Sequence, residues 1–280
     1  MSSTGSRFHT SFAWGFLAII TVLVGLYAKV AFVNTESHKS LGQHNAEHFD
    51  NVASSAYEVE WVRKLAKQIT AFLQENTEWL GVPAESGDCE LKLLDYACGN
   101  GIYSKVLAPY VTKLRGIDIS GRMIEEYNAT AQSVGLSPEQ MRGVQGDLLD
   151  DESAAKLQDP EFFGFDIVIM SMALHHVEDT GKMIRKFAER LAPGGTVLII
   201  DWVTPSESGC RSMPLHGREK IPMRHTIAHM GFTKQEMLDM LSHAGLVDGE
   251  VKWLNERSEM PEDFGGPQQL FFARAKKPSA

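Results

Sequence analysis

The sequence is most informative at Leu93-Leu94-Asp95-Tyr96-Ala97-Cys98-Gly99-Asn100-Gly101, which Gly116-Ile117-Asp118 follows. Its apolar start predicts a buried strand over 92–96 that ends in an acid and small residues. Gly99 and Gly101 allow a sharp turn into a helix and let a ligand lie against bare backbone. Asp118 closes a second predicted strand, where a carboxylate can accept hydrogen bonds from both hydroxyls of a ribose. The turn has too few glycines for a pyrophosphate, so these parts indicate a nucleoside site.

Strands and helices alternate along the rest of the chain, which predicts a parallel sheet with crossover helices. Apolar residues at helical spacing also predict one or two amphipathic helices between residues 50 and 79. The predicted strands are 92–96, 113–117, 141–145, 165–170, 196–201, 247–253 and 269–276, the last two an antiparallel hairpin at the edge. The predicted helices of this part are 103–110, 121–134, 180–191 and 232–244.

Five segments in this order resemble the motifs of class I S-adenosylmethionine-dependent methyltransferases. They are residues 93–101, 116–118, 146–148, 165–177 and 191–196. The helices at 50–79 resemble the N-terminal cover of the ubiquinone-biosynthesis-like members, although Ala97 stands where many members have another glycine. The resemblance implies a doubly wound, mostly parallel, seven-stranded Rossmann-like α/β sheet with S-adenosyl-L-methionine as cofactor. It implies methyl transfer to an oxygen, nitrogen or sulfur atom of a small acceptor that is lipophilic or belongs to secondary metabolism.

The resemblance also implies which residues bind the cofactor. They are Tyr57, Asp95, Ala97, Gly99, Gly101, Asp118, Ile119, Met123, Asp147, Leu148, Ser171 and Met172. Asp118 would hold the ribose, Asp95 the methionine ammonium group and Asp147 the adenine amino group. The alternatives are a surface acid, a cap for the following helix and a solvated acid, respectively. A purely structural turn, a core methionine and a half-buried aromatic remain the alternatives for the glycines, Met123 and Tyr57.

Four histidines are candidates for the chemistry. Neutral imidazoles are natural bases near pH 7, so His175 and His176 are the predicted catalytic residues, with packing as the alternative. His225 and His229 are four residues apart and would share one face of a helix. No acid or cysteine accompanies them at ligand spacing, so we expect a place in the substrate site, the core or the surface rather than a metal site.

The composition excludes several classes of function. A formal net charge of -9 argues against nucleic-acid binding, which needs a basic patch or stripe. The three cysteines are odd in number and lack C-x-x-C spacing, so neither a disulfide framework nor a zinc site is predicted. We therefore expect a small-molecule substrate, no nucleic-acid partner and no metal.

An uncharged apolar run occupies residues 12–28 and extends to residue 33 if Lys29 snorkels. Seventeen uncharged positions would cover about 26 Å of a hydrocarbon core of roughly 30 Å. The run lacks the polar stripe of a buried soluble helix and a good cleavage site for a signal peptide. We expect a single-pass membrane anchor over 12–33, with a mitochondrial presequence as an alternative. The flanking charges do not fix its orientation, and we favour a domain that faces the cytosol.

These observations divide the chain into a tail (1–11), the anchor (12–33), a linker (34–49) and a methyltransferase domain (50–280). Within the domain, cover helices are expected over 50–88 and the Rossmann-like core over 89–280. Two other functions stay open. One is a cofactor-binding adaptor without turnover, and the other is a nucleotide-dependent oxidoreductase, which the missing third glycine disfavours.

Overall fold

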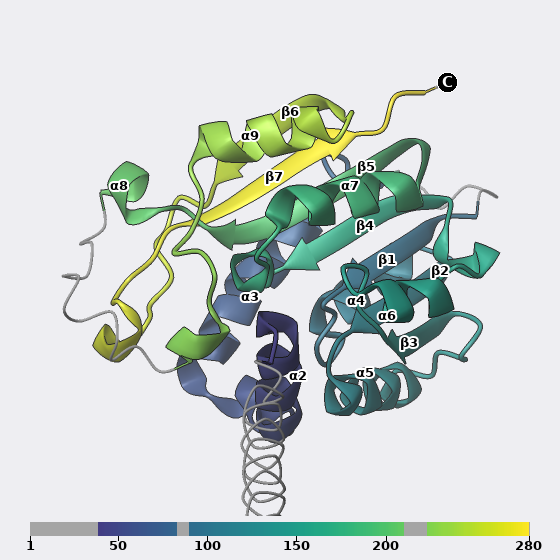
Figure 1. The fold of residues 1–280 in the computed structure, drawn as a ribbon, viewed down its shortest axis with the longest axis horizontal. Helices are drawn as coiled ribbons and strands as arrows, with labels where there is room; N and C mark the ends of the chain where they lie inside the picture. The colour runs from purple at the N-terminus through teal and green to yellow at the C-terminus, as the bar shows by residue number, and fades with distance from the viewer. Residues whose placement is uncertain (1–38, 83–89, 210–222, 280) are drawn as a thin grey trace, which may run out of the picture. The chain divides into compact units, whose positions relative to one another are not determined.

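A seven-stranded sheet with the order β3-β2-β1-β4-β5-β7-β6 forms the centre of the domain (Figure 1). This computed structural model describes residues 39–82, 90–209 and 223–279. The strands are β1 (Lys92–Tyr96), β2 (Lys113–Asp118), β3 (Met141–Gln145), β4 (Phe165–Ser171), β5 (Leu191–Trp202), β6 (Val247–Trp253) and β7 (Leu270–Lys276). The pairs from β3 to β5 are parallel, and β7 runs antiparallel to β5 and β6. The predicted mostly parallel sheet is therefore confirmed.

Helices cover both faces of this sheet. They are α2 (Leu41–Val52), α3 (Glu60–Glu75), α4 (Ile102–Leu107), α5 (Gly121–Ser133), α6 (Asp151–Lys156), α7 (Thr180–Arg190), α8 (Pro205–Ser208) and α9 (Lys234–His243). Short 3-10 turns connect them, among them η1 (Ala56–Glu58), η3 (Pro160–Phe162), η4 (Leu174–His176) and η6 (Arg224–Thr226). Figure 1 shows α7 and α9 in front of the sheet and α3 behind it.

Each face of the sheet has its own apolar core. Phe187 of α7 and Met237 of α9 belong to one core, and Ile69 of α3 and Tyr127 of α5 belong to the other. Successive strand residues point to opposite faces, so Leu93 and Leu94 lie in different cores. This is why the central strands are continuous apolar runs rather than alternating ones.

Tyr127 fills a slot made by three glycines. A Cβ added to Gly101 would lie 2.9 Å from the nearest atom of this ring. The same distance is 2.7 Å for a Cβ on Gly116 and 2.9 Å for a Cβ on Gly143. Gly116 and Gly143 are paired in register on β2 and β3, and Tyr127 is 0 % exposed. These glycines are therefore required for close packing of α5 on the sheet, because a side chain at any of them would displace the ring.

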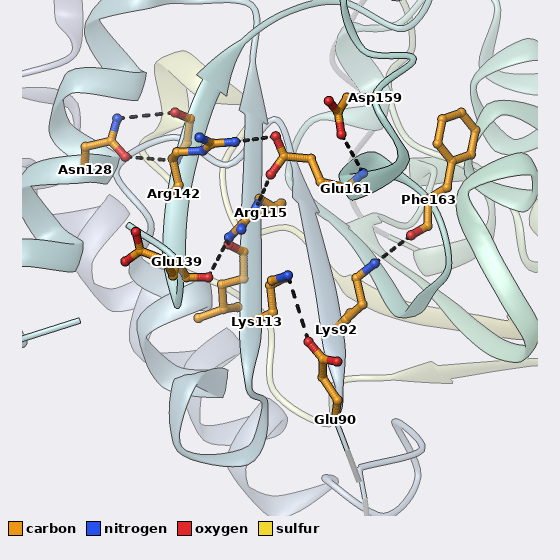
Figure 2. A network of polar contacts seen from close by, with 12 residues as sticks. Glu90, Lys92, Lys113, Arg115, Asn128, Glu139, Arg142, Asp159, Glu161 and Phe163 are labelled. Atoms are coloured by element: carbon orange, nitrogen blue, oxygen red, sulfur yellow. Dashed lines mark hydrogen bonds and ion pairs between the residues drawn. The ribbon is translucent and has the colours of Figure 1, made fainter. Parts of the chain in front are cut away.

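At the amino ends of the strands, which we call the amino edge of the sheet, charged side chains pair with one another (Figure 2). Nε of the buried Arg115 donates to Glu161 Oε2 at 2.9 Å. Arg142 donates to the other oxygen of Glu161. Lys92 Nζ donates to the Phe163 carbonyl at 2.8 Å. Each of these three cations thus has an acidic or carbonyl partner, although Arg142 Nε is buried without a hydrogen bond among the described residues.

Three local predictions need correction. The linker expected over 34–49 is helical from Leu41, because this stretch packs on α5 and η6 and buries Asn45. β5 begins at Leu191 rather than residue 196, since a register shift lets the Pro193–Gly195 segment continue the strand. His225 and His229 do not share a helix, because η6 ends at Thr226.

The predicted tail and membrane anchor, residues 1–33, lie outside the described residues. Among the residues that the structure describes, no helix is both long and apolar enough to span a bilayer.

Candidate active site

Four acids lie at or just beyond the carboxyl ends of the strands, which we call the carboxyl edge of the sheet. Asp95 ends the apolar run of β1, Asp118 ends β2, Asp147 follows β3 and Asp201 lies near the end of β5. Within the described ranges, none of the four pairs with a lysine or arginine. The sheet order reverses between β1 and β4, and the crevice at such a point is where open α/β sheets bind ligands.

Asp118 is held by two backbone N–H groups. Its Oδ2 accepts a hydrogen bond from Gly99 N at 2.9 Å, and its Oδ1 accepts one from Ser120 N at 2.9 Å. Burial raises the pKa of Asp118 to about 6, and these two N–H groups oppose that shift. Each oxygen keeps a lone pair, so the carboxylate can accept two further O–H donors.

Asp95 belongs to a buried hydrogen-bond chain beneath the turn. Ser104 Oγ donates to Asp95 Oδ2 at 2.8 Å and lies 2.9 Å from the Tyr127 hydroxyl. Burial raises the pKa of Asp95 to about 7, although the hydrogen bond from Ser104 lowers it. Asp95 therefore anchors the start of α4 through Ser104 and not as the helix N-cap, which is Gly101.

Tyr57 of η1 lies over the glycine turn. A Cβ on Gly99 would stand 2.0 Å from the Tyr57 hydroxyl, so a side chain at this position would exclude the contact. Burial raises the pKa of this hydroxyl.

The adjacent strands β1 and β4 are each followed by a non-glycine residue with positive φ, Ala97 at 56° and Met172 at 55°. Such backbone strain is concentrated at functional sites.

The structure also places the residues expected around an adenine. Asp147 Oδ1 accepts from the Tyr96 hydroxyl at 3.0 Å and from Leu149 N at 2.8 Å, so Asp147 is fixed and not a freely solvated acid. Leu148 and Met123 are 1 % and 3 % exposed, which favours packing roles for their side chains. Ile119 is half-buried beside Asp118.

His175, in η4 just beyond β4, and Asp201, near the end of β5, form a buried pair. His175 Nδ1 lies 2.8 Å from Asp201 Oδ1, and Asp201 Oδ2 accepts from the His175 backbone N at 3.0 Å. Trp202 N also donates to Asp201, at 2.7 Å. A carboxylate can only accept here, so Nδ1 carries the proton and Nε2 of the neutral ring has a free lone pair. Ser171, at the end of β4, is buried close by in sequence.

His176 has the same tautomer for a different reason. Its Nδ1 lies 2.6 Å from the Thr226 carbonyl, which can only accept. Burial and the neighbouring His175 hold the pKa of His176 well below its usual range. The ring packs against His175, with centroids 4.1 Å apart, and edge-on against Phe49 of α2 at 5.3 Å.

Helix α2 connects the two halves of the site. At its C-terminal end, Asp50 Oδ1 accepts from Ser120 Oγ at 2.6 Å and from Arg122 N at 3.0 Å. Ser120 is the residue whose backbone N binds Asp118. One turn earlier, Asn45 Nδ2 donates to the His176 carbonyl at 3.2 Å. The same helix thus contacts Ser120, which holds Asp118, and the η4 turn that carries His176.

Six residues of this site were not predicted from the sequence. They are Asn45, Phe49, Asp50, Ser104, Tyr127 and Asp201. Asp201 could have been found, because it closes an apolar strand as Asp118 does. The α2 residues gave no comparable signal, since polar residues dominate that helix. In the part of the chain that the structure describes, no three His, Cys, Asp or Glu side chains could hold a metal ion together.

Comparison with known proteins identifies the domain. The profile of a methyltransferase domain family matches residues 59–249. The chain belongs to this family. An uncharacterized methyltransferase of Schizosaccharomyces pombe is 30% identical over 161 residues, 58% of this chain and 55% of the relative. A ubiquinone biosynthesis O-methyltransferase of Proteus mirabilis is 25% identical over 167 residues, 58% of this chain and 61% of the relative.

The chain spans a little over half the length of these two curated relatives. A solved phosphoethanolamine N-methyltransferase 2 of Haemonchus contortus, in complex with S-adenosyl-L-methionine, shares the fold. It aligns with a TM-score of 0.56 and 14% identity, covering 82% of this chain and 60% of that one. The expected superfamily and the S-adenosylmethionine dependence of the methyltransferase domain are thereby confirmed.

The residues present fit an S-adenosyl cofactor. Asp118 can accept from both hydroxyls of a ribose, and Gly99 has no side chain, which lets the Tyr57 hydroxyl lie directly over the turn. Asp95 and Asp147 would receive the ammonium and adenine amino donors through oxygens that no described cation neutralises. These individual assignments remain predictions.

Proposed function

We propose that this methyltransferase domain transfers the methyl group of S-adenosyl-L-methionine to an oxygen, nitrogen or sulfur atom of a small molecule, with His175 as general base. The observation that carries the proposal is the buried pair between His175 Nδ1 and Asp201 Oδ1, 2.8 Å apart, at the carboxyl edge of the sheet.

The bound cofactor supplies an activated methyl group, so the protein mainly aligns the reactants and excludes water. Asp118, with Gly99 and Ser120 fixing its two oxygens, would hold the ribose. Met172, strained at the end of β4, and Ser171 would face the methyl group. A base is needed only when the attacking atom must lose a proton.

In that step the acceptor X–H proton would move to His175 Nε2 as the X–C bond forms and the bond from the methyl carbon to sulfur breaks, with S-adenosylhomocysteine as the leaving group. Asp201 keeps the ring in the required tautomer and stabilises the imidazolium, the part that a carboxylate plays in other His–Asp pairs. His176 is a weaker base because burial lowers its pKa, so we assign it a role in binding the acceptor.

A small acceptor is supported by two features. The net charge is -9, which disfavours a nucleic-acid substrate. The curated relative from Proteus mirabilis carries the name ubiquinone biosynthesis O-methyltransferase, a small-molecule activity. The adaptor alternative would require binding of the cofactor without turnover. Family membership speaks against the oxidoreductase alternative.

We further propose that residues 12–33 anchor the chain in a membrane, with the domain facing the cytosol. The uncharged apolar composition of this run supports the proposal. Membranes from expressing cells should retain the full chain after alkaline carbonate washing. Release into the wash would contradict an integral anchor.

The test of activity has two parts. The full chain in detergent is titrated by calorimetry with S-adenosylmethionine, S-adenosylhomocysteine and NAD, and then incubated with methyl-labelled cofactor and extracts fractionated by size. Tight binding of the two adenosyl ligands with label transfer to a small molecule is expected. Preference for NAD would overturn the proposal, and binding without any labelled product would favour the adaptor.

A further inference from the structure

Residues of α2, η4 and η6 bring rings and an amide together beside His175. We call Asn45, His48, Phe49, His176 and His225 the α2–η4 cluster. Phe49 meets His176 edge-on at 5.3 Å and 85°, and His48 meets His225 edge-on at 5.4 Å and 74°. His175 joins the cluster through His176, whose ring centroid is 4.1 Å away. The cluster therefore adjoins the base assigned above.

The cluster contains polar atoms that the protein leaves unsatisfied. Asn45 is only 6 % exposed, and its Nδ2 is used by the His176 carbonyl. Its Oδ1 is buried and has no hydrogen-bond partner among the described residues. The same holds for His48 Nε2. A buried polar atom without a partner destabilises the fold, so a ligand that satisfies it gains affinity.

The unsatisfied groups are mainly hydrogen-bond acceptors. His175 and His176 both use Nδ1–H, for Asp201 and for the Thr226 carbonyl, so each presents an Nε2 lone pair. Asn45 Oδ1 is a third acceptor. A ligand that binds here must therefore provide donors.

The charges around the cluster disfavour an anionic ligand. Burial, with His225 as a second cause, lowers the pKa of His48, and His176 is also held neutral. The negative charge of Asp201 is engaged by three N–H groups. The guanidinium of Arg224, on η6, donates to the Ile227 carbonyl. An anionic group would meet lone pairs rather than donors at the three acceptors.

We propose that the methyl acceptor is a planar molecule that carries no anionic group and has at least two O–H or N–H donors. One donor is the group to be methylated and faces His175 Nε2. The second binds Asn45 Oδ1 and His176 Nε2, while Phe49 packs against the ring by the edge-on geometry that aromatic pairs prefer. This inference rests on the proposed function, because it names the acceptor class of the same site.

Equilibrium binding tests the proposal without turnover. The full chain in detergent is saturated with S-adenosylhomocysteine and titrated with the three dihydroxybenzene isomers, phenol and phenyl phosphate. The isomers differ only in the spacing of their two donors. We expect at least one isomer to bind about tenfold more tightly than phenol, and phenyl phosphate to bind no better than phenol.

Two variants of α2 test whether the second donor group of the ligand binds Asn45. Asn45→Leu should reduce the preference for the best isomer over phenol by about fivefold or more. His44→Leu alters an exposed neighbour on the same helix and should keep the preference. The affinity of each variant for S-adenosylhomocysteine shows that the fold is intact. If Asn45→Leu does not fold, the comparison of isomers with phenol in the unaltered chain still decides the proposal.

Each outcome has a distinct meaning. Equal binding of phenol and all isomers, tighter binding of phenyl phosphate, or an unchanged preference in a folded Asn45→Leu variant would overturn the acceptor class. Those results leave methyl transfer itself untouched. Failure to bind S-adenosylhomocysteine would instead overturn the proposed function.

Discussion

Charged side chains at the amino edge and at the carboxyl edge of the sheet have different kinds of partner. At the amino edge, Glu161 forms ion pairs with both Arg115 and Arg142, one through each carboxylate oxygen (Figure 2). At the carboxyl edge, Asp95 and Asp118 are as deeply buried as Arg115, yet only N–H and O–H groups hold them.

The physical consequence is a difference in pKa. Without a cation, burial raises the pKa of Asp95 to about 7 and that of Asp118 to about 6. Isolated buried acids are costly, and their clustering marks a functional site. The charges of the amino edge have partners within the fold, whereas we propose that the unpaired acids of the carboxyl edge accept hydrogen bonds from the cofactor.

The largest effect should come from the base at the carboxyl edge. His175→Phe removes the acceptor of the X–H proton and should lower kcat by about 100-fold or more. Stopped assays with labelled cofactor measure kcat, and calorimetry should show cofactor affinity within threefold of the unaltered chain. His243→Phe, at an exposed site, is the control. Unchanged kcat in His175→Phe would remove the base from the mechanism.

Asp118→Ala should be next in size. It deletes the proposed ribose acceptor and should weaken cofactor binding by about 2–3 kcal/mol, the order expected for charged hydrogen bonds. Isothermal titration measures the change. If affinity stays the same, the ribose lies elsewhere, and the contrast between the two edges loses its functional meaning.

Glu161→Gln at the amino edge should show the opposite pattern. Arg115 would remain buried with a weaker partner, so the free energy of unfolding should fall by about 1–2 kcal/mol. Cofactor affinity should not change. Urea unfolding provides the stability, and Glu90→Gln is a matched control because its contact with Lys113 is long, 3.9 Å, and partly exposed. A loss of cofactor affinity in Glu161→Gln would show that the two edges are coupled.

The smallest expected single contribution is the one that Asp118 makes to the pH dependence of cofactor affinity. The ribose hydroxyls and the ammonium group are donors that prefer ionised carboxylates. The pKa of Asp118 is about 6 and that of Asp95 about 7, so lowering the pH through these values protonates both acids. Each pH unit below a pKa costs about 1.4 kcal/mol of binding through that group. Between pH 7 and pH 5 the contribution of Asp118 should therefore fall by about tenfold, and protonation of Asp95 adds to this loss.

Calorimetry at each pH measures the profile. Asp118→Asn should remove the part of the profile that Asp118 contributes. A flat profile in the unaltered chain would contradict the role of these acids.

Local patterns in the sequence predicted the strands and the acids that close them. Apolar runs and the glycine turn depend on neighbours in the chain, and Asp95 and Asp118 were identified from such patterns alone. The family resemblance added Tyr57 and Asp147, whose places in the fold are consistent with it.

Only the tertiary structure decided which distant groups meet. Gly101, Gly116 and Gly143 enclose the ring of Tyr127, and Asp201 lies against His175 across 26 residues of sequence. Asn45 reaches His176 from 131 residues away, from a helix that the sequence presented as a linker. Such contacts leave no periodic mark in the sequence, because they depend on how distant elements pack against one another and not on the preferences of adjacent residues.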